Sequence, residues 1–358
     1  MSDPSPKPER FVLVLAGGRG ERFWPWSQPE RPKQLLPLAR GGRTLLAATL
    51  ERAMRLVPAD HVLVLTSRDL VAAVERDCSG LGVRVMGEPV MRNTAPAVGA
   101  AAAWFSAGGG DPAFIVMPSD HAIDDVAAFV EDVTRALEQA ERSAVLVTFG
   151  IRPAAADPNF GYVRRGPALG PRLHRVAQFT EKPDRARAEE WVATGEYLWN
   201  SGIFVWRCST FFNALEAGRP DLAGPLRGLA AHRDAGAFQV ALDGVFPGLE
   251  SISVDYAVLE HAPNVLMVEA AFDWDDLGSW AAWAHRQPRD GRGNVLFGQA
   301  IAVDCDGCII VGDGSPAAAM NLRDMIVVNA GGGALACRVE DSAQVRRVAE
   351  AARTRSTA

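Results

Sequence analysis

The sequence predicts an α/β protein, with a Rossmann-like, mostly parallel sheet covered by helices on both faces and a small C-terminal β domain. Continuous apolar runs of strand length, such as residues 11–15 and 113–117, are typical of strands buried on both faces. Segments with helical periodicity alternate with such runs over the first 150 residues. Beyond residue 290 the apolar runs become short, and turns containing Gly, Asp or Asn separate them.

The first half of the chain supplies five of the expected strands, at residues 11–15, 61–66, 83–86, 113–117 and 145–149. Helices are expected between them, at residues 44–56, 69–76, 95–105 and 126–140. Ligands of open α/β sheets bind at the carboxyl ends of the strands. The turns that follow Leu15, Gly87 and Met117 are therefore expected to place polar groups at one edge of the sheet.

The pattern changes after residue 150, with strands expected from 163, at 175–179 and at 203–206. Asp184 is expected to cap a helix over 185–194, residues 209–262 are expected to be largely helical, and 272–280 to return to the sheet. Short β runs and a helix over 342–352 follow, and a partial left-handed β-helix is one candidate for this part. The expected boundaries are a disordered tail at 1–10, a main domain at 11–289 with halves meeting near 150, and a β domain at 290–358.

Composition excludes several classes of function. The 358 residues include 37 Lys and Arg and 43 Asp and Glu, so no basic field for nucleic acid or a membrane surface is expected. No apolar run has transmembrane length, and the N-terminus lacks the apolar region of a signal peptide. Five scattered cysteines favour a reducing, cytoplasmic compartment. Cys305 and Cys308 form a lone C-x-x-C, which Cys337 extends without a recognisable fourth zinc ligand, so we expect buried thiols instead.

A glycine-rich, cationic stretch follows the first strand. Glycine lets the backbone approach a ligand closely with its N–H groups pointing inward, and four cations are close in sequence: Arg19, Arg22, Arg31 and Lys33. The stretch lacks the third glycine of a dinucleotide-binding fingerprint and the Gly-Lys-Ser/Thr of a Walker A loop. It predicts a site for a polyphosphate, and the alternative is a tight turn with solvated arginines.

Residues 15–34, L-A-G-G-x-G-x-R-F-W-P-x-S-x-P-x-x-P-K-Q, resemble the signature of the sugar-phosphate nucleotidyltransferases. The F-W-P and P-K-Q forms are similar to the mannose-1-phosphate guanylyltransferase branch of that family. Further motifs match in order: N-T-A-P-A at 93–97, P-S-D-H at 118–121, F-G-Y at 160–162, F-T-E-K-P at 179–183, W-N-S-G-I-F at 199–204, S-V-D-Y-A at 253–257 and W-D-D-L-G-S-W at 274–280. The resemblance extends over residues 11–340.

The resemblance implies transfer of GMP from GTP to α-D-mannose 1-phosphate, which gives GDP-mannose and pyrophosphate by in-line attack of the sugar phosphate on the α-phosphorus. Such chemistry needs positioning and charge neutralisation more than a covalent partner. The residues that it implies as catalytic are Arg22, Lys33, Asp120 and Lys182. It also implies Mg²⁺ held by Asp120 and Asp276, with Asp275 as the competing assignment for the second carboxylate.

The same resemblance implies two sets of binding residues. Nucleotide binding is expected at Leu15, Ala16, Gly17, Gly18, Gly20, Glu88, Asn93, Thr94 and Ser119. Sugar-phosphate binding is expected at Gly161, Tyr162, Glu181, Lys182, Asn200 and Asp255. Guanine offers two N–H donors, so an acceptor near its edge would prefer it to adenine. Plainer interpretations are a helix cap for Asn93 and Thr94, an N-cap for Asp120 and a structural role for His121, because a phosphate nucleophile needs no base.

Other functions stay open from the sequence. One is a pyrophosphorylase with another sugar 1-phosphate or nucleotide, such as glucose 1-phosphate with UTP or dTTP. Another is a non-catalytic homologue that senses nucleotide sugars, which the presence of all the expected charged site residues disfavours. Ser119 departs from the alanine usual in the family. A homodimer is a further expectation, whereas the isomerase activity of longer bifunctional relatives is not expected.

Overall fold

The computed structural model describes residues 9–18 and 20–356, so most of the expected N-terminal tail and Arg19 lie outside the described residues. The chain divides into two compact units. The first unit comprises the residues up to Gly17 together with 49–119 and 123–274, and the second comprises 18–48, 120–122 and the residues from Asp275 onward. In this division Gly17 groups with the strand before it and the residues from Gly18 onward group with the C-terminal residues, while the expected domain boundaries near 150 and 289 stay predictions.

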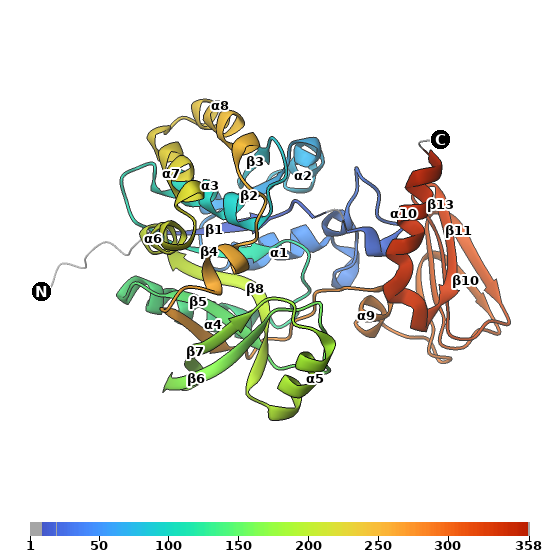
Figure 1. Ribbon diagram of the computed structural model, residues 1–358. Coiled ribbons are helices and arrows are strands. Elements are labelled where there is room, and N and C mark those ends of the chain that lie inside the picture. Colours follow the sequence, from blue (N-terminus) through green and yellow to red (C-terminus); the bar gives the residue numbers. More distant parts are fainter. Residues whose placement is uncertain (1–8, 19, 357–358) are drawn as a thin grey trace, which may run out of the picture. The chain divides into compact units, whose positions relative to one another are not determined.

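The first unit contains a nine-stranded sheet in the order β3-β2-β1-β4-β8-β5-β9-β7-β6 (Figure 1). Five of its strands form parallel pairs with one another or with β9: β1 (Arg10–Leu15), β2 (Val62–Ser67), β3 (Arg84–Glu88), β4 (Ala113–Pro118) and β5 (Leu146–Ile151). The other strands are β6 (Tyr162–Gly170), β7 (Leu173–Thr180), β8 (Tyr197–Arg207) and β9 (Val265–Glu269). Since β8 is antiparallel to both β4 and β5, the sheet is parallel in its first half and mixed in its second.

Helices cover this sheet because its strands are apolar on both faces. Alternate strand residues, such as Leu13, Leu63 and Phe114, share a core cluster with α3 (Thr94–Ser106) and α7 (Pro220–Gly228), which lie on one side of β1 in Figure 1. The remaining helices associated with the sheet are α2 (Val71–Asp77), α4 (Val126–Arg142), α5 (Arg185–Thr194), α6 (Cys208–Gly218) and α8 (Ala235–Val245). Helix α1 (Leu45–Ala53) has residues in both units. The predicted α/β class is confirmed.

The second unit contains a four-stranded sheet in the order β10-β11-β12-β13. Its strands are β10 (Val295–Val303), β11 (Ile309–Met320), β12 (Met325–Ala330) and β13 (Gly333–Arg338), of which only β13 pairs antiparallel. Two helices accompany it, α9 (Trp280–His285) and α10 (Val345–Ser356). Phe23, Trp26 and Leu36 are buried in one cluster with residues of this sheet and of α9. The segment after the first strand is therefore part of the core of the C-terminal β domain.

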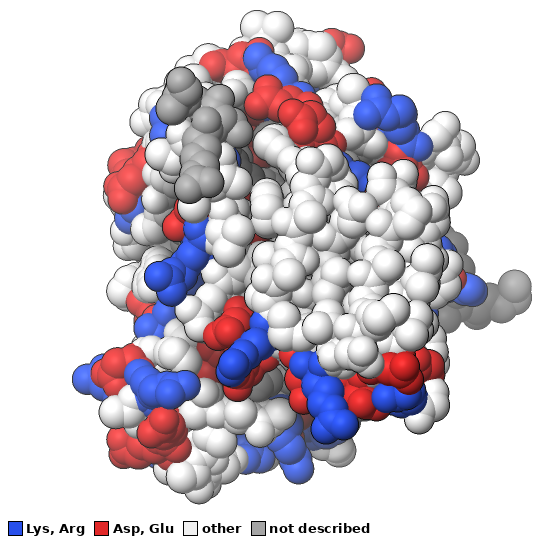
Figure 2. Space-filling model, turned by 90° about the vertical axis from the view of Figure 1, so that its right-hand side faces the viewer, with Lys and Arg blue, Asp and Glu red and all other residues white. Residues whose placement is uncertain are grey.

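Two surface features complete the description. Figure 2 views the protein from the side on which β10 and β11 lie in Figure 1, and a broad central area there lacks charged side chains. Large apolar side chains exposed on these two strands are Leu296, Ile301, Val303 and Met320. In the described part of the chain, no helix is both long and apolar enough to cross a membrane.

The expected return to the sheet at residues 272–280 is wrong. Within that segment Asp275 alone makes a β-bridge, with Ala122, and the nearest strand is β9, which the sequence analysis did not assign. The physical reason is the run of aspartates, whose side chains accept backbone hydrogen bonds and favour turns over a strand. Asp273 Oδ1 accepts the N–H groups of residues 124 and 125 at 2.9 and 2.7 Å, and Asp275 Oδ1 accepts that of Leu277 at 2.7 Å.

Candidate active site

The glycine-rich loop lies directly against Lys33. Gly20 has φ +60°, a conformation that glycine adopts without strain, and a Cβ at this position would overlap both the Cβ and the backbone nitrogen of Lys33. Gln34 Nε2 donates to the carbonyl oxygen of Gly18 at 3.1 Å, which ties the loop to the turn that carries Lys33. The glycine at position 20 therefore allows the loop and the lysine to be neighbours.

Three other sequence-predicted residues come together with this lysine. Lys33 Nζ donates to Asp120 Oδ2 at 2.9 Å and also to the main-chain carbonyl oxygen of Asp276. Arg22 Nη1 lies 4.0 Å from Asp276 Oδ2. The paired backbone hydrogen bonds between Ala122 and Asp275, 2.9 and 3.1 Å, join the segments that carry the two aspartates. We call Arg22, Lys33, Asp120 and Asp276 the charged cluster.

Burial differs sharply within the charged cluster. The side chain of Lys33 is 9% exposed, whereas that of Asp120 is 36% exposed, so the carboxylate faces solvent over a buried cation. Burial alone would raise the pKa of Asp120, but the charge and hydrogen bond of Lys33 outweigh it and hold that pKa below its ordinary value. The pKa of Asp276 is raised, first by burial and then by Asp275 and Asp120, against the opposing charges of Lys33 and Arg22.

The carboxylates of the charged cluster fit a hard divalent cation. Mg²⁺ is typically held by one or two carboxylates together with substrate phosphates, and Asp120 and Asp276 offer such a pair. Asp275 and Asp276 each accept one backbone N–H with Oδ1, from Leu277 at 2.7 Å and from Gly278 at 3.1 Å, but only the carboxylate of Asp276 also lies near Arg22, 4.0 Å from its Oδ2, among the contacts described for the charged cluster. Within the described residues, no group of three or more His, Cys, Asp or Glu side chains could hold a metal without further ligands. His121 Nε2 lies 3.9 Å from Asp120 Oδ1, beside the cluster.

A second group of predicted residues lies at the ends of β1, β3 and β4 in the first unit. Glu88 is 7% exposed, and its Oε1 has no hydrogen-bond partner among the described residues. A Cβ at Gly17 would lie 3.6 Å from Glu88 Oε2, so the carboxyl group is next to the start of the glycine-rich loop. Burial raises the pKa of Glu88 to about 8. An unpaired buried carboxyl group is costly for folding, and the nucleotide-binding role of Glu88 stays a prediction.

The other expected nucleotide contacts near Glu88 have structural partners. The N–H of Ala16 donates to Leu65 at 2.8 Å, and that of Ser119 donates to Leu15 at 3.0 Å. Asn93 caps α3, with φ +64°, through a 2.8 Å hydrogen bond from the N–H of Thr94. Thr94 Oγ1 accepts the N–H of Val254 at 2.8 Å. The helix-cap interpretation of Asn93 is therefore confirmed, and its nucleotide role stays a prediction.

A third group of predicted residues surrounds Asn200 in the first unit. Asn200 Nδ2 donates to Asp255 Oδ1 at 2.9 Å. Lys182, in the left-handed conformation at φ +50°, places Nζ 3.1 Å from Glu181 Oε1. A side chain at Gly161 would collide with the carboxyl group of Glu181, so the glycine leaves room for that group. Burial, followed by the charge of Glu181, raises the pKa of Asp255. We call Glu181, Lys182, Asn200 and Asp255 the carboxylate cluster.

Tyr162 is not brought into the carboxylate cluster. Its side chain is fully buried, and its hydroxyl both donates to the carbonyl and accepts the N–H of Asp157 at 3.1 Å. Two residues that the sequence analysis missed do support the cluster. Thr148 Oγ1 donates to Asn200 Oδ1 at 2.9 Å, and Glu260 Oε1 accepts the N–H of Glu181 at 2.9 Å. Neither residue stands in a recognisable motif, so only the fold reveals them.

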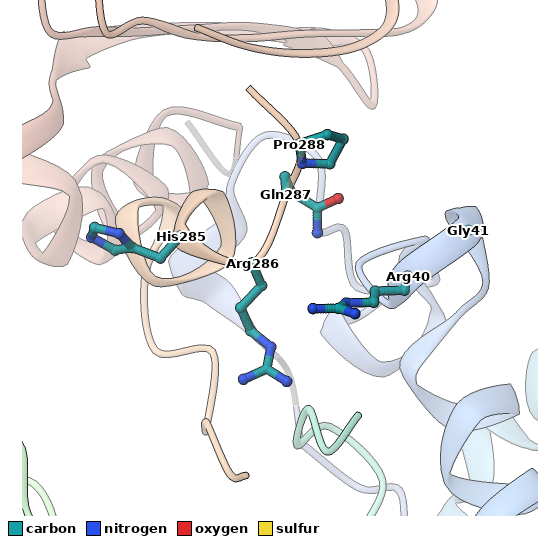
Figure 3. A pocket seen from close by; sticks show the side chains of 6 residues that line it. All are labelled: Arg40, Gly41, His285, Arg286, Gln287 and Pro288. Carbon is teal, nitrogen blue, oxygen red and sulfur yellow. The ribbon is translucent and has the colours of Figure 1, made fainter. Parts of the chain in front are cut away.

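A cavity of about 520 Å³ lies elsewhere in the second unit (Figure 3). Its lining contains none of the predicted site residues and consists of Arg40, Gly41, His285, Arg286, Gln287 and Pro288. The guanidinium groups of Arg40 and Arg286 point into the same space, whereas the ring of His285 points away from it (Figure 3).

Two protein families match this chain. Residues 11–290 match the family described as Nucleotidyl transferase, and residues 298–351 match the family described as MannoseP isomerase/GMP-like beta-helix domain. The second match covers most of the four-stranded sheet and part of α10. For this β domain the sequence analysis gave a partial β-helix as one candidate.

Individual proteins give the same picture. The chain is 36% identical over 344 residues to the mannose-1-phosphate guanylyltransferase of Escherichia coli, which covers 94% of this chain and 73% of the relative. It is 33% identical to the mannose-1-phosphate guanylyltransferase RfbM of Salmonella typhimurium, over 94% of this chain and 71% of the relative. A solved structure from Thermus thermophilus, named mannose-1-phosphate geranyltransferase, is 35% identical with a TM-score of 0.86 and covers 96% of this chain and 99% of that chain.

Proposed function

Because this chain belongs to the nucleotidyl transferase family, as a sugar-phosphate nucleotidyltransferase, we propose that it transfers GMP from GTP to α-D-mannose 1-phosphate. In this reaction an oxygen of the sugar phosphate attacks the α-phosphorus, the bond to the β-phosphate oxygen breaks, and pyrophosphate leaves as GDP-mannose forms. The observation that supports it most directly is the charged cluster, in which Lys33 contacts Asp120 and Asp276 beside a glycine-rich loop. Similar relatives bear the name of this activity.

The charged cluster supplies what this displacement requires. Lys33 neutralises charge at the α-phosphate, and Arg22 with the loop N–H groups stabilises the pyrophosphate as it leaves. Asp120 and Asp276 are the residues that would hold Mg²⁺, whose positive charge lowers the cost of bringing two anionic phosphates together. No side chain has to remove a proton, because the attacking phosphate is already ionised. This accounts for a cluster of charged groups without a nucleophile and its base.

The carboxylate cluster supplies hydrogen-bonding groups for the sugar. Glu181 and Asp255 accept hydrogen bonds from hydroxyl groups, and Asn200 both donates and accepts them. Lys182, whose side chain is 58% exposed, contacts the phosphate of the sugar substrate. Directional acceptors of this kind suit a hexose, whose hydroxyl groups differ from those of other sugars mainly in orientation.

Glu88 supplies the preference for guanine. In its ionised form the carboxylate accepts the N1–H and the amino group of guanine together, whereas adenine presents no donor at N1. The free Oε1 of Glu88 then gains partners on binding, which removes the cost of its burial. Asn93, Thr94 and Ser119 contribute to the nucleotide site through the backbone that they hold in place.

Pyrophosphate release tests this proposal across a matrix of substrates. The purified protein is incubated with GTP, ATP, UTP or dTTP, and with mannose 1-phosphate or glucose 1-phosphate, in the presence of Mg²⁺. We expect the highest kcat/KM for GTP with mannose 1-phosphate. Preference for UTP or dTTP with glucose 1-phosphate would assign the chain to another pyrophosphorylase. Tight binding of GDP-mannose without turnover of any pair would assign it to a sensing role.

A homodimer and a cytoplasmic location are parts of the same proposal. The edge strand β10 contains no charged residue, although charged side chains normally protect exposed sheet edges from association. Ile301 and Val303 are exposed on this strand, and a second copy of the chain would cover them. Sedimentation analysis is expected to find a dimer in the wild type and a monomer in Ile301→Asp. The cysteines described in the structure are unpaired, as a reducing compartment would leave them.

A further inference from the structure

The loop that carries Arg22 is held by residues from the far end of the chain. Glu21 precedes Arg22 in the sequence, and its carboxylate forms ion pairs with two arginines of α10. Arg346 Nε lies 3.5 Å from Glu21 Oε2, and Arg353 Nη1 donates to Glu21 Oε1. The buried side of α10, at Val345 and Ala349, belongs to the same unit. The first contact thus connects the loop to the C-terminal helix.

A second contact holds the segment just after the loop. Asp313 Oδ2, on β11, accepts hydrogen bonds from Trp26 Nε1 and from Arg31 Nη1, each at 2.7 Å. Trp26 is fully buried, so its N–H needs a partner inside the protein. Burial tends to raise the pKa of Asp313, but these two donors hold it below its ordinary value, and the carboxylate stays charged. One side chain therefore fixes two positions between Arg22 and Lys33.

A third contact joins the same segment to the turn between β12 and β13. Gln28 Nε2 donates to the carbonyl oxygens of Pro25 and Gly331, at 2.7 and 3.1 Å. Gly331 has φ +58°, and a Cβ there would overlap the oxygen of Pro25. The turn lies so close to Pro25 that only glycine fits. Helix α10, strand β11 and this turn thus all contact residues 21–31.

We propose that Glu21 and Asp313 are positioning residues, through which the C-terminal sheet and helix hold the phosphate-binding loop in its binding conformation. The loop contains three glycines, so its own sequence leaves it many conformations. Arg22 and Lys33 must nevertheless lie in fixed places to meet a triphosphate, because misplacement by about 1 Å costs roughly 100-fold in rate. The C-terminal β domain supplies that order from outside the loop.

This inference rests on the proposed function, because it takes the ligand of the loop to be a nucleoside triphosphate. Two variants test it, Glu21→Gln and Asp313→Ala, with Asp306→Ala as the matched control. Asp306 is also a carboxylate of the C-terminal β domain that pairs with two arginines, Arg292 at 3.0 Å and Arg323 at 3.6 Å, and both of these lie outside residues 21–31. Each variant is assayed for turnover and for binding of inorganic tripolyphosphate with Mg²⁺ by calorimetry.

We expect both test variants to raise KM for GTP and Kd for tripolyphosphate by about tenfold, because each loses a charged hydrogen bond that orders the loop. KM for mannose 1-phosphate should change less than twofold, and Asp306→Ala should behave as the wild type. Asp313→Asn should lie between, since its amide oxygen still accepts the N–H of Trp26 while the charge facing Arg31 is lost.

Two results would overturn the inference. One is unchanged tripolyphosphate binding in folded Glu21→Gln and Asp313→Ala, and the other is an equal loss in Asp306→Ala, which would indicate general destabilisation. Circular dichroism and thermal unfolding establish whether each variant folds. If Asp313→Ala does not fold, Glu21→Gln still decides, because its contact lies at the surface. Tripolyphosphate has neither base nor sugar, so its affinity tests the loop even where the substrate matrix refutes GTP or mannose 1-phosphate.

Discussion

The charged cluster and the carboxylate cluster contain similar residue types and differ in how their charges are balanced. In the charged cluster, Asp120 is ionised against a buried lysine, and its pKa is lowered. In the carboxylate cluster, Asp255 faces Glu181 as well as Lys182, and burial with that like charge raises its pKa. The partners of a carboxylate, more than its residue type, therefore indicate what it binds. A carboxylate paired with a cation, such as Asp120, suits phosphates and a metal ion, whereas a hydrogen-bonded carboxyl group with a raised pKa, such as Asp255, suits hydroxyls.

Substitution of Lys33 should cause the largest loss of activity. In Lys33→Met the apolar stem is kept and the charge is lost, so Asp120 and Asp276 repel one another and the α-phosphate loses its neutralising group. We expect kcat/KM to fall by about 1,000-fold, with both substrates saturating less well. Pyrophosphate release measures the effect, and Arg323→Met, which removes an exposed cation, serves as the control. Near-normal turnover in Lys33→Met would show that the cluster does not act on phosphate.

The next largest effect is expected for Asp276, on the Mg²⁺ concentration that the reaction needs. Comparison with Asp275 tests which of the two neighbouring carboxylates holds the cation. Asp276→Asn should raise the Mg²⁺ concentration needed for half-maximal rate by roughly 30-fold, since a carboxylate that holds the cation is lost. Asp275→Asn should change it less than threefold, because the amide oxygen can still accept the N–H of Leu277. A titration of the rate with Mg²⁺ compares the two variants. The reverse order would move the metal site to Asp275.

Substitution in the carboxylate cluster should affect one substrate alone. Asn200 Nδ2 donates a hydrogen bond to the carboxylate of Asp255. In Asp255→Asn, one of the two orientations of the new amide places its NH2 group against that of Asn200. The substitution also removes one of the two oxygens that can accept a hydrogen bond from a sugar hydroxyl group. We expect KM for mannose 1-phosphate to rise by about tenfold while KM for GTP stays within twofold. Steady-state kinetics with each substrate varied in turn provides the test. Equal effects on both KM values would contradict a sugar-specific role.

Glu88 should give the smallest effect and one that depends on pH. Its pKa of about 8 exceeds its ordinary value, so the folded protein retains a proton that the unfolded chain has released. The free energy of unfolding should therefore fall as pH rises from about 5 to 8. Glu88→Gln should lack this fall and be more stable than the wild type at pH 8 by on the order of 2 kcal/mol. Urea unfolding at several pH values measures the difference, and parallel curves for the two proteins would contradict an uncharged Glu88.

Much of the candidate site was open to prediction because the signals are local in sequence. The order of strand, glycine-rich loop and cations marks residues 15–34, and the family resemblance implies Asp120, Lys182 and Asp276. Gly20 and Gly161 both stand in motifs that the sequence analysis identified. A side chain at Gly20 would overlap Lys33, and one at Gly161 would overlap the carboxyl group of Glu181. The expected α/β class followed from the alternation of apolar runs and helical periodicity in the same way.

The rest depends on contacts between residues far apart in the chain. Asp313 and Thr148 stand in segments without a motif, and only the fold brings them to Trp26 and Asn200. Strand β9 follows a long helical region, and the sequence analysis expected the return to the sheet a few residues later, at 272–280. The grouping of residues 18–48 with the C-terminal sheet was equally invisible, because the apolar residues of this segment, such as Phe23 and Leu36, fit any core.

The tryptophans around the loop also give the protein an optical property. Trp26 and Trp280 have ring centroids 5.8 Å apart with planes 9° from parallel, and Trp283 meets both edge-on. Indole rings at such distances share their electronic excitations, so the trio should give a circular dichroism signal that no single ring would produce. Trp26 lies between Arg22 and Lys33 in sequence. A displacement of this segment should therefore change the circular dichroism signal, which needs no added dye.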